Sequence, residues 1–242
     1  TIAPEQEREF TVDYTAAADN PISDLAPVDT VPPVITITSP LENSQYPHNQ
    51  VINIDYTAAD DFSGLASTTI TIDGQAIAAA TLDLFYYLNG EHALTIAVSD
   101  RAGNLASSTV KFKIISSLDS VISDIARLYA LGWITDRTTG KIMDTEIEEI
   151  NWRFKLLDEA KRLIAKYIKK VETSQNTAKI KAKLIQRYHE DLERLDQKNS
   201  KNINIVFDRL ARSLGKYLKA KLINQAGYDI IMSDINYLRN NL

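Results

Sequence analysis

The segment Val34-Ile35-Thr36-Ile37-Thr38 begins a run of short strands that continues to Thr109-Val110-Lys111-Phe112-Lys113-Ile114-Ile115. Apolar and polar residues alternate in these stretches with the period of two that marks a strand with one buried face. Between them, Thr68-Thr69-Ile70-Thr71-Ile72 leads into Asp73-Gly74, a strong signal for a two-residue hairpin turn. About seven short strands, with turn residues every ~8–12 positions, predict a β-sandwich over residues 29–115.

The hydrophobic period changes after residue 115. Apolar residues recur at helical spacing from Leu118 to Tyr129, and a heptad-like seam runs from Ile147 to Val171. Breaks are expected at Gly132, Asp136–Gly140, Ser174–Thr177 and Asn199–Asn202. Residues 116–242 are therefore predicted to form an antiparallel α-helical bundle of four to six helices, so the fold class is all-β plus all-α in separate domains.

Residues 1–28 resemble part of the β region. Thr11–Ala17 parallels Asn53–Ala59 at an offset of 42 residues, and such internal repeats are typical of arrayed modules. The copy is too short for a sandwich, which needs about 100 residues. It is either the tail of a truncated module or a source of extra strands beside the following domain, in its own chain or in a neighbouring one, and we expect the second. Asp29–Pro33 follows as a stiff linker, because its two prolines restrict the backbone.

Composition excludes several classes of protein. The absence of cysteine excludes disulfides, thiolate metal sites and cysteine nucleophiles. No apolar run approaches the ~20 residues that a membrane span needs. Residues 1–115 hold 15 acidic and 4 basic residues, whereas residues 116–242 hold 17 acidic and 23 basic residues. This split indicates either an anionic partner for the basic half or mutual attraction of the halves.

The sequence begins at Thr1 and not at a methionine. Thr1 is not a natural start, so we expect a processed chain or a piece of a longer protein.

Two resemblances to known families accompany these patterns. Asp29-Thr30-Val31-Pro32-Pro33, Asp60-Asp61-Phe62-Ser63-Gly64 and Asp100-Arg101-Ala102-Gly103-Asn104 together resemble bacterial immunoglobulin-like domains, with Phe85-Tyr86-Tyr87 more aromatic than usual. That resemblance implies a spacer or adhesive module of a secreted or surface protein. Leu131-Gly132-Trp133-Ile134 and Leu222–Ile230 resemble the FIMAH-type helical module found at the ends of exported microbial proteins, which implies an extracellular accessory role without known chemistry.

No arrangement of residues predicts catalysis, so we expect no enzyme activity and no organic cofactor. The loop residues His48 and His92 and the helical His189 form no ligand pair and no nucleophile arrangement, which predicts surface or structural roles. The eight glycines form no phosphate-binding loop.

Calcium is the one candidate metal. Asp60, Asp61, Asp100 and Asn104 lie in loops that can meet at one end of the sandwich, and Asp29 lies in the linker before it. Hard cations take several oxygen ligands, and calcium at a domain boundary would stiffen a rod of domains. The alternative is that these residues serve the turns themselves, because Asp and Asn side chains bond the local backbone.

These patterns predict a non-catalytic segment of an extracellular, cell-surface protein, with a β-sandwich spacer and a helical docking or assembly module. Its partners would be other domains of a longer chain, like subunits or a cell-surface glycan. Nucleic acid is not expected, because acidic residues such as Glu148 and Glu190 dilute the basic helices. Two alternatives are a self-assembling subunit of a surface layer or filament, and a glycan-binding accessory region of a secreted hydrolase.

Overall fold

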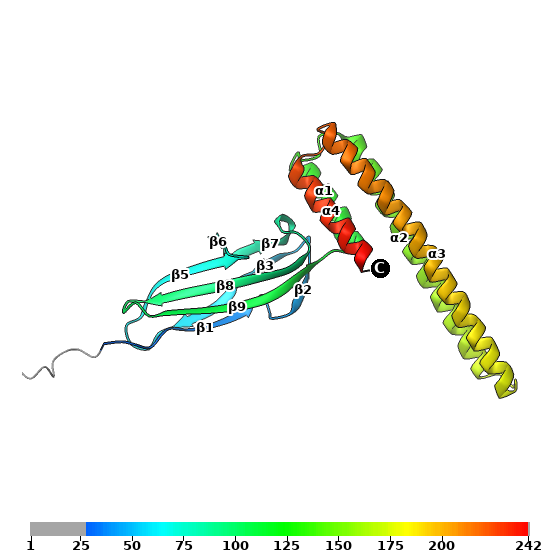
Figure 1. Cartoon of the computed structure of the whole chain (residues 1–242), viewed down its shortest axis with the longest axis horizontal. Helices are drawn as coiled ribbons and strands as arrows, with labels where there is room; N and C mark the ends of the chain where they lie inside the picture. Colours follow the sequence, from blue (N-terminus) through cyan, green and yellow to red (C-terminus); the bar gives the residue numbers. More distant parts are fainter. Residues whose placement is uncertain (1–27, 242) are drawn as a thin grey trace, which may run out of the picture.

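The computed structural model describes residues 28–241, so the predicted partial repeat at residues 1–27 lies outside the described residues. A β-sandwich is followed by four helices that form an antiparallel bundle, which confirms the predicted fold class (Figure 1). The strands are β1 (Val34–Ser39), β2 (Ser44–Pro47), β3 (Val51–Asn53), β4 (Asp55–Ala59), β5 (Leu65–Ile72), β6 (Gln75–Ile77), β7 (Thr81–Asp83), β8 (Gly90–Asp100) and β9 (Leu105–Ile115).

The sandwich has one broad layer and one divided layer. The broad sheet has the order β2-β9-β8-β5-β6, and the pairs β1-β4 and β3-β7 form the opposing layer. Alternate residues of both layers point inward, so that Ile52 and Leu82 pack with Leu94, Ile96 and Phe112 in one buried core. The predicted Asp73-Gly74 turn joins β5 to β6, and both residues have positive φ, as this hairpin turn requires.

The helices are α1 (Leu118–Ala130), α2 (Arg137–Glu172), α3 (Ala178–Lys219) and α4 (Gln225–Asn240). Ser117 caps α1, with reciprocal bonds to Ser120. The predicted break at Asp136–Gly140 is wrong, because Asp136 caps the start of α2 through the backbone N–H of Thr139.

The predicted break at Asn199–Asn202 is also wrong, since α3 is continuous there. Asn199 donates from its side chain to the backbone carbonyl of Arg153 on α2, so tertiary contact outweighs its weak helix propensity. Because of these two differences, the expected four to six helices are four, and two of them are long.

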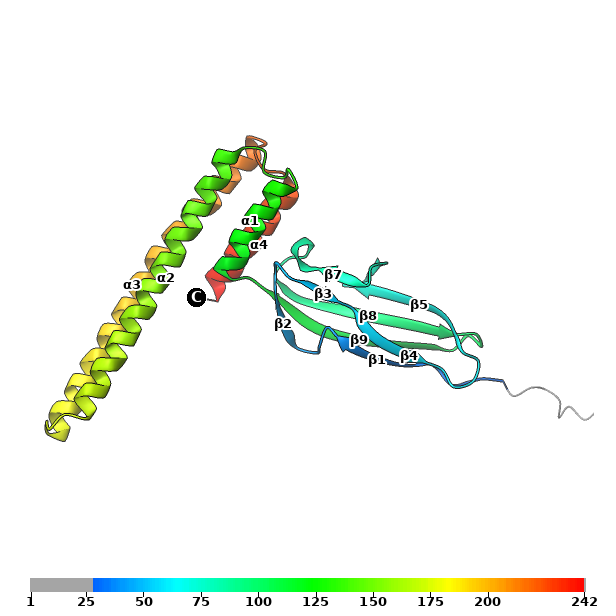
Figure 2. The same cartoon turned by 180° about the vertical axis from the view of Figure 1, so that it is seen from behind.

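Helices α2 and α3 form a hairpin that projects beyond the shorter helices α1 and α4 (Figures 1 and 2). At ~1.5 Å per residue, α2 spans ~54 Å and α3 spans ~63 Å. Near α1 and α4, both helices contribute fully buried residues such as Ile150 and Phe207. From Asp158 to Asn202 no side chain is buried, so this stretch is a two-helix arm without a third layer. None of the helices described here has both the length and the apolar composition needed to cross a membrane.

Candidate functional site

Three of the predicted calcium ligands meet at the end of the sandwich farthest from the helices. Carboxylate oxygens of Asp29, Asp60 and Asp100 all lie within 4.8 Å of one another, although they come from three separate loops. Asn104 joins them, since its side-chain amide donates to Asp100 Oδ2 at 2.7 Å and to the Asp29 carbonyl at 3.2 Å. Asp61 is exposed and is not a member of this group.

The same carboxylates hold the local turns. Asp29 accepts from the backbone N–H groups of Val31 and Ser63, and Asp60 accepts from that of Gly64. Hydrogen bonds from Ser63 and Val31 lower the pKa of Asp29. Hydrogen bonds within the turns therefore account for most of the carboxylate oxygens of this group. Asp60 Oδ2 is the exception, because it is buried without a hydrogen-bond partner in the described chain. No described basic residue forms an ion pair with any of the three, so the group carries uncompensated negative charge.

The opposite end of the sandwich is joined to the helices by an aromatic anchor. The turn η3 (Leu84–Tyr86) places Phe85 in the core of the helical bundle, where it is fully buried although it belongs to the β region. Trp133 packs at 6.1 Å between ring centroids, and the Arg127 guanidinium lies 4.3 Å from the centre of the Phe85 ring. Arg127 also forms a two-bond ion pair with Asp83. The sandwich and the bundle have separate hydrophobic cores, and Phe85 of the β region belongs to that of the bundle.

A buried polar network lies beside this anchor. We call it the junction network; it consists of His48, Asn89, Ser116, Asp124 and Asp234. Three of its members, the imidazole and the two carboxylates, are completely shielded from solvent. His48 Nδ1 lies 2.7 Å from Asp124 Oδ2 on α1 and 3.7 Å from Asp234 Oδ1 on α4. Asp234 Oδ1 also accepts from Asn89 at 2.8 Å and from Ser116 at 2.5 Å.

The hydrogen-bond partners determine where the protons lie. His48 Nε2 is 2.7 Å from the carbonyl of Tyr87, which can only accept, so this nitrogen carries a proton. A second proton lies between Nδ1 and Asp124, because two lone pairs would repel at 2.7 Å. Asp124 Oδ1 and Asp234 Oδ2 are buried without hydrogen-bond partners among the described residues. A histidinium and two carboxylates would leave one buried negative charge, which a single further proton removes.

The pKa values follow from this environment. Burial raises the pKa of Asp234 from 3.8 to about 6, although the charge of His48 opposes the shift. Burial lowers the pKa of His48, but the Asp124 bond and the charges of Asp234 and Asp124 outweigh it, so the net pKa is raised above 6.5. At acidic pH, His48 and Asp234 are therefore both protonated, and the network is electrically balanced.

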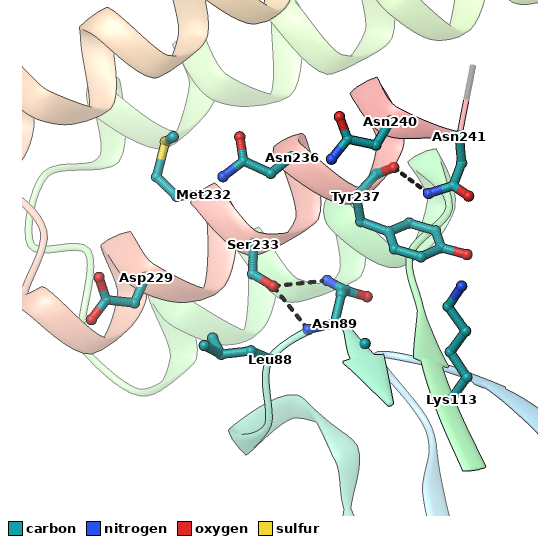
Figure 3. Close-up of a pocket in the computed structure, with 11 residues that line it drawn as sticks. Leu88, Asn89, Lys113, Asp229, Met232, Ser233, Asn236, Tyr237, Asn240 and Asn241 are labelled. Atoms are coloured by element: carbon teal, nitrogen blue, oxygen red, sulfur yellow. Dashed lines mark hydrogen bonds between the residues drawn. The ribbon is translucent and has the colours of Figure 1, made fainter. Parts of the chain in front are cut away.

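An open cleft of about 660 Å³ lies next to the junction network, between the sandwich and α4 (Figure 3). Most of the residues that line it are of polar types; Asn89 is bonded to Ser233, and the Lys113 ammonium lies 5.6 Å from the centre of the Tyr237 ring. These contacts extend the interface between the domains along one side of α4.

The other two histidines differ from His48. His92 lies in strand β8 and not in a loop as predicted, because the strand begins at Gly90. It bonds to Asp73 at 2.7 Å and to the Leu88 carbonyl at 2.8 Å, a structural role. His189 lies on α3 and is exposed. Sequence reasoning predicted a structural or surface role for all three, but it contained no signal that His48 meets Asp124 and Asp234, which are 76 and 186 residues away.

Part of the β region is similar to a known domain family. Residues 33–96 match the family model described as a bacterial Ig domain. No curated protein matches the chain. The match covers only part of the chain, but it supports a non-catalytic domain of the kind found in surface proteins. The resemblance of residues 116–242 to a FIMAH-type module remains a prediction.

Several solved structures are similar to part of the chain. Fibronectin(III)-like modules of Clostridium thermocellum CbhA are 20% identical with a TM-score of 0.31, and the similarity covers 36% of this chain and 48% of that chain. The PKD1 domain of Vibrio anguillarum Epp is 14% identical with a TM-score of 0.29, covering 37% of this chain and 100% of that one. CopC from Methylosinus trichosporium OB3b is 14% identical with a TM-score of 0.25, covering 34% and 95%. The chain spans about half the length of the first of these structures.

Proposed function

We propose that this chain is a non-catalytic, extracellular segment of a cell-surface protein, in which a β-sandwich spacer holds a helical arm at a set angle. The arm is the free part of the α2–α3 hairpin, residues 158–202, and its role is docking or assembly. The observation that carries this proposal is the junction, where Phe85 and the junction network join the sandwich to the bundle. Insertion of a sandwich side chain into the core of the bundle suits a mechanical element better than two domains on a loose tether.

Surface labelling tests this proposal, because the chain has no cysteine of its own. Ala178 lies at the end of the hairpin and is exposed, so Ala178→Cys gives one reactive thiol at the tip. On intact cells that carry the parent gene, we expect a membrane-impermeant maleimide to label this variant as fully as it does after lysis. The control Leu210→Cys places the thiol at a position with no exposure and should stay unlabelled in the folded protein. Labelling of Ala178→Cys only after lysis would contradict the surface location.

We also propose that the group of Asp29, Asp60, Asp100 and Asn104 binds calcium. Three carboxylates with no cationic partner in the described chain would be compensated by a divalent cation, and Asp60 Oδ2 is available as a ligand. The group lies at the N-terminal end of the sandwich, so a bound ion would stiffen the connection to residues before Asp29.

Calcium at about 100 times its dissociation constant should add ~3 kcal/mol of stability, which raises the melting temperature by roughly 5–10 °C. Asp60→Asn should abolish that response, because it removes charge at the carboxylate with the free oxygen. Asp61→Asn is the matched control and should keep the response, since Asp61 is exposed and outside the group. Identical melting curves of the native chain in calcium and in chelator would exclude the site.

A further inference from the structure

Helix α2 carries an exposed apolar stripe beside its contact with α3. Trp152, Leu156, Leu163 and Tyr167 are 50–59% exposed, which is unusual for side chains of this size on a helix surface. With Ala160 they follow one another at steps of four, four, three and four, so all five lie on one face of the helix. The four large side chains keep at least half of their surface exposed, although Tyr167 also stacks on Tyr188 of α3. We name these five residues the α2 stripe.

The order of residues in the α2 stripe is nearly the same in both directions. From Ala160 outward, each side has a leucine and then an aromatic residue, and the smallest side chain is at the centre. Two antiparallel copies of α2, related by a twofold axis at Ala160, would place Trp152 of each opposite Tyr167 of the other. Leu156 of each copy would meet Leu163 of the other, and the small Ala160 would allow close approach of the two helices.

The charges along α2 favour the same arrangement. Residues 141–159 contain six acidic and three basic residues, whereas residues 160–172 contain one acidic and five basic residues. An antiparallel pair therefore sets the acidic half of each helix against the basic half of the other, and a parallel pair would oppose like charges. Glu148 and Lys170 would become neighbours across the twofold axis. Both are exposed and form no ion pair in the described chain.

One aromatic side chain of the stripe is already held in place. Tyr167 stacks on Tyr188 of α3 at 6.2 Å between ring centroids, so less side-chain freedom is lost on association. The stripe is only ~22 Å long at ~1.5 Å per residue, shorter than the contact of a permanent dimer. A reversible dimer with a dissociation constant on the order of micromolar is the association expected of such a surface.

We propose that the α2 stripe is a homodimer contact, in which two hairpins pair antiparallel through α2 and the second occupant is another copy of this chain. The inference deepens the proposed assembly role of the arm and rests on it. The exposed apolar side chains favour a protein partner over an anionic polymer. A polymer bound to the basic residues of the 160–172 segment would leave these side chains exposed to water.

Cysteine crosslinking of the full chain tests the proposed contact directly. Ala160→Cys places one thiol at the proposed twofold axis, where two copies can approach within disulfide reach. At tens of micromolar, we expect oxidation to convert most of this variant to a covalent dimer and to leave Ala178→Cys monomeric. A chain that does not pair through this face would not crosslink at Ala160, and that result would overturn the proposal.

Two further variants separate the stripe from other causes of dimer formation. Leu163→Glu in the Ala160→Cys chain should reduce crosslinking at least tenfold, whereas Leu105→Glu on β9, at a position 73% exposed, should leave it unchanged.

A charge swap tests the antiparallel register. Glu148→Lys should weaken the dimer, and adding Lys170→Glu should restore it. Failure of the charge swap to restore crosslinking would overturn the antiparallel register. A chain that pairs only when polyphosphate is added would overturn the proposed occupant. None of these results depends on where the protein is located in the cell, so the surface-labelling experiment remains an independent test.

Discussion

Replacing His48 with alanine is expected to lower the free energy of unfolding by about 3–5 kcal/mol. The substitution leaves the buried Asp124 and Asp234 without a cationic partner, and it also removes the hydrogen bond to the Tyr87 carbonyl. Breaking a buried ion pair by removing one member is costly, since the other charge stays desolvated. Denaturant unfolding, followed by the fluorescence of Trp133 next to the junction, measures the effect.

The matched control is His189→Ala. His189 is exposed on α3, so its removal should change stability by no more than about 0.5 kcal/mol. An equal loss in both variants would show that histidine replacement in general, and not the junction, is responsible. A His48→Ala chain as stable as the native one would exclude the junction network as a stabilising contact.

The junction is expected to weaken as the pH rises. The folded-state pKa of Asp234 is about 6 against 3.8 when unfolded, so its protonation favours the folded state. That contribution is complete below pH 3.8 and is lost as the pH passes through about 6. The raised pKa of His48 acts in the same direction at higher pH, since its contribution is complete below pH 6.5 and is lost above its folded value. For Asp234 alone, the difference corresponds to ~3 kcal/mol.

Asp234→Asn isolates this titration, because an amide resembles the protonated acid and can still accept from Asn89 and Ser116. The variant should match the native chain near pH 4 and exceed it in stability near pH 8. Unfolding free energies measured across this range provide the comparison. A native chain whose stability rises between pH 4 and pH 8, with no crossing by the variant, would contradict the assigned direction.

Local patterns in the sequence were sufficient for most of the fold. Alternation predicted the strands, Asp73-Gly74 predicted the β5–β6 turn, and the period change near residue 115 separated sandwich from helices. Two predicted helix breaks were wrong, because hydrogen bonds that the local sequence pattern does not show stabilise the helix at these positions. Asp136 reads as a helix breaker but caps α2, and Asn199 reads as a break but bonds to Arg153 across the hairpin. Propensity alone cannot show these partners.

Of the two candidate sites, the sequence predicted the acidic group at the end of the sandwich but not the junction network. Asp29, Asp60, Asp100 and Asn104 could be placed together because the linker before the sandwich and the loops after β4 and β8 were expected to meet at one end. The junction network could not, since its members are scattered from His48 to Asp234 and share no motif. One signal was present in the sequence: the unusual aromatic run Phe85-Tyr86-Tyr87 coincides with the segment that enters the helical core. An unexpected large apolar residue in a loop is a reason to look for a neighbouring domain.

The most direct test of the rigid arm is the distribution of distances between one spin label on β8 and one on α3. Glu91→Cys and Lys201→Cys provide exposed attachment points in a chain that has no other cysteine, and dilution with unlabelled chain removes distances between copies. We expect a single narrow distribution for the otherwise native chain and a broad one when His48→Ala is added. An equally broad distribution in the chain that retains His48 would contradict the claim that the junction holds the two domains at a set angle.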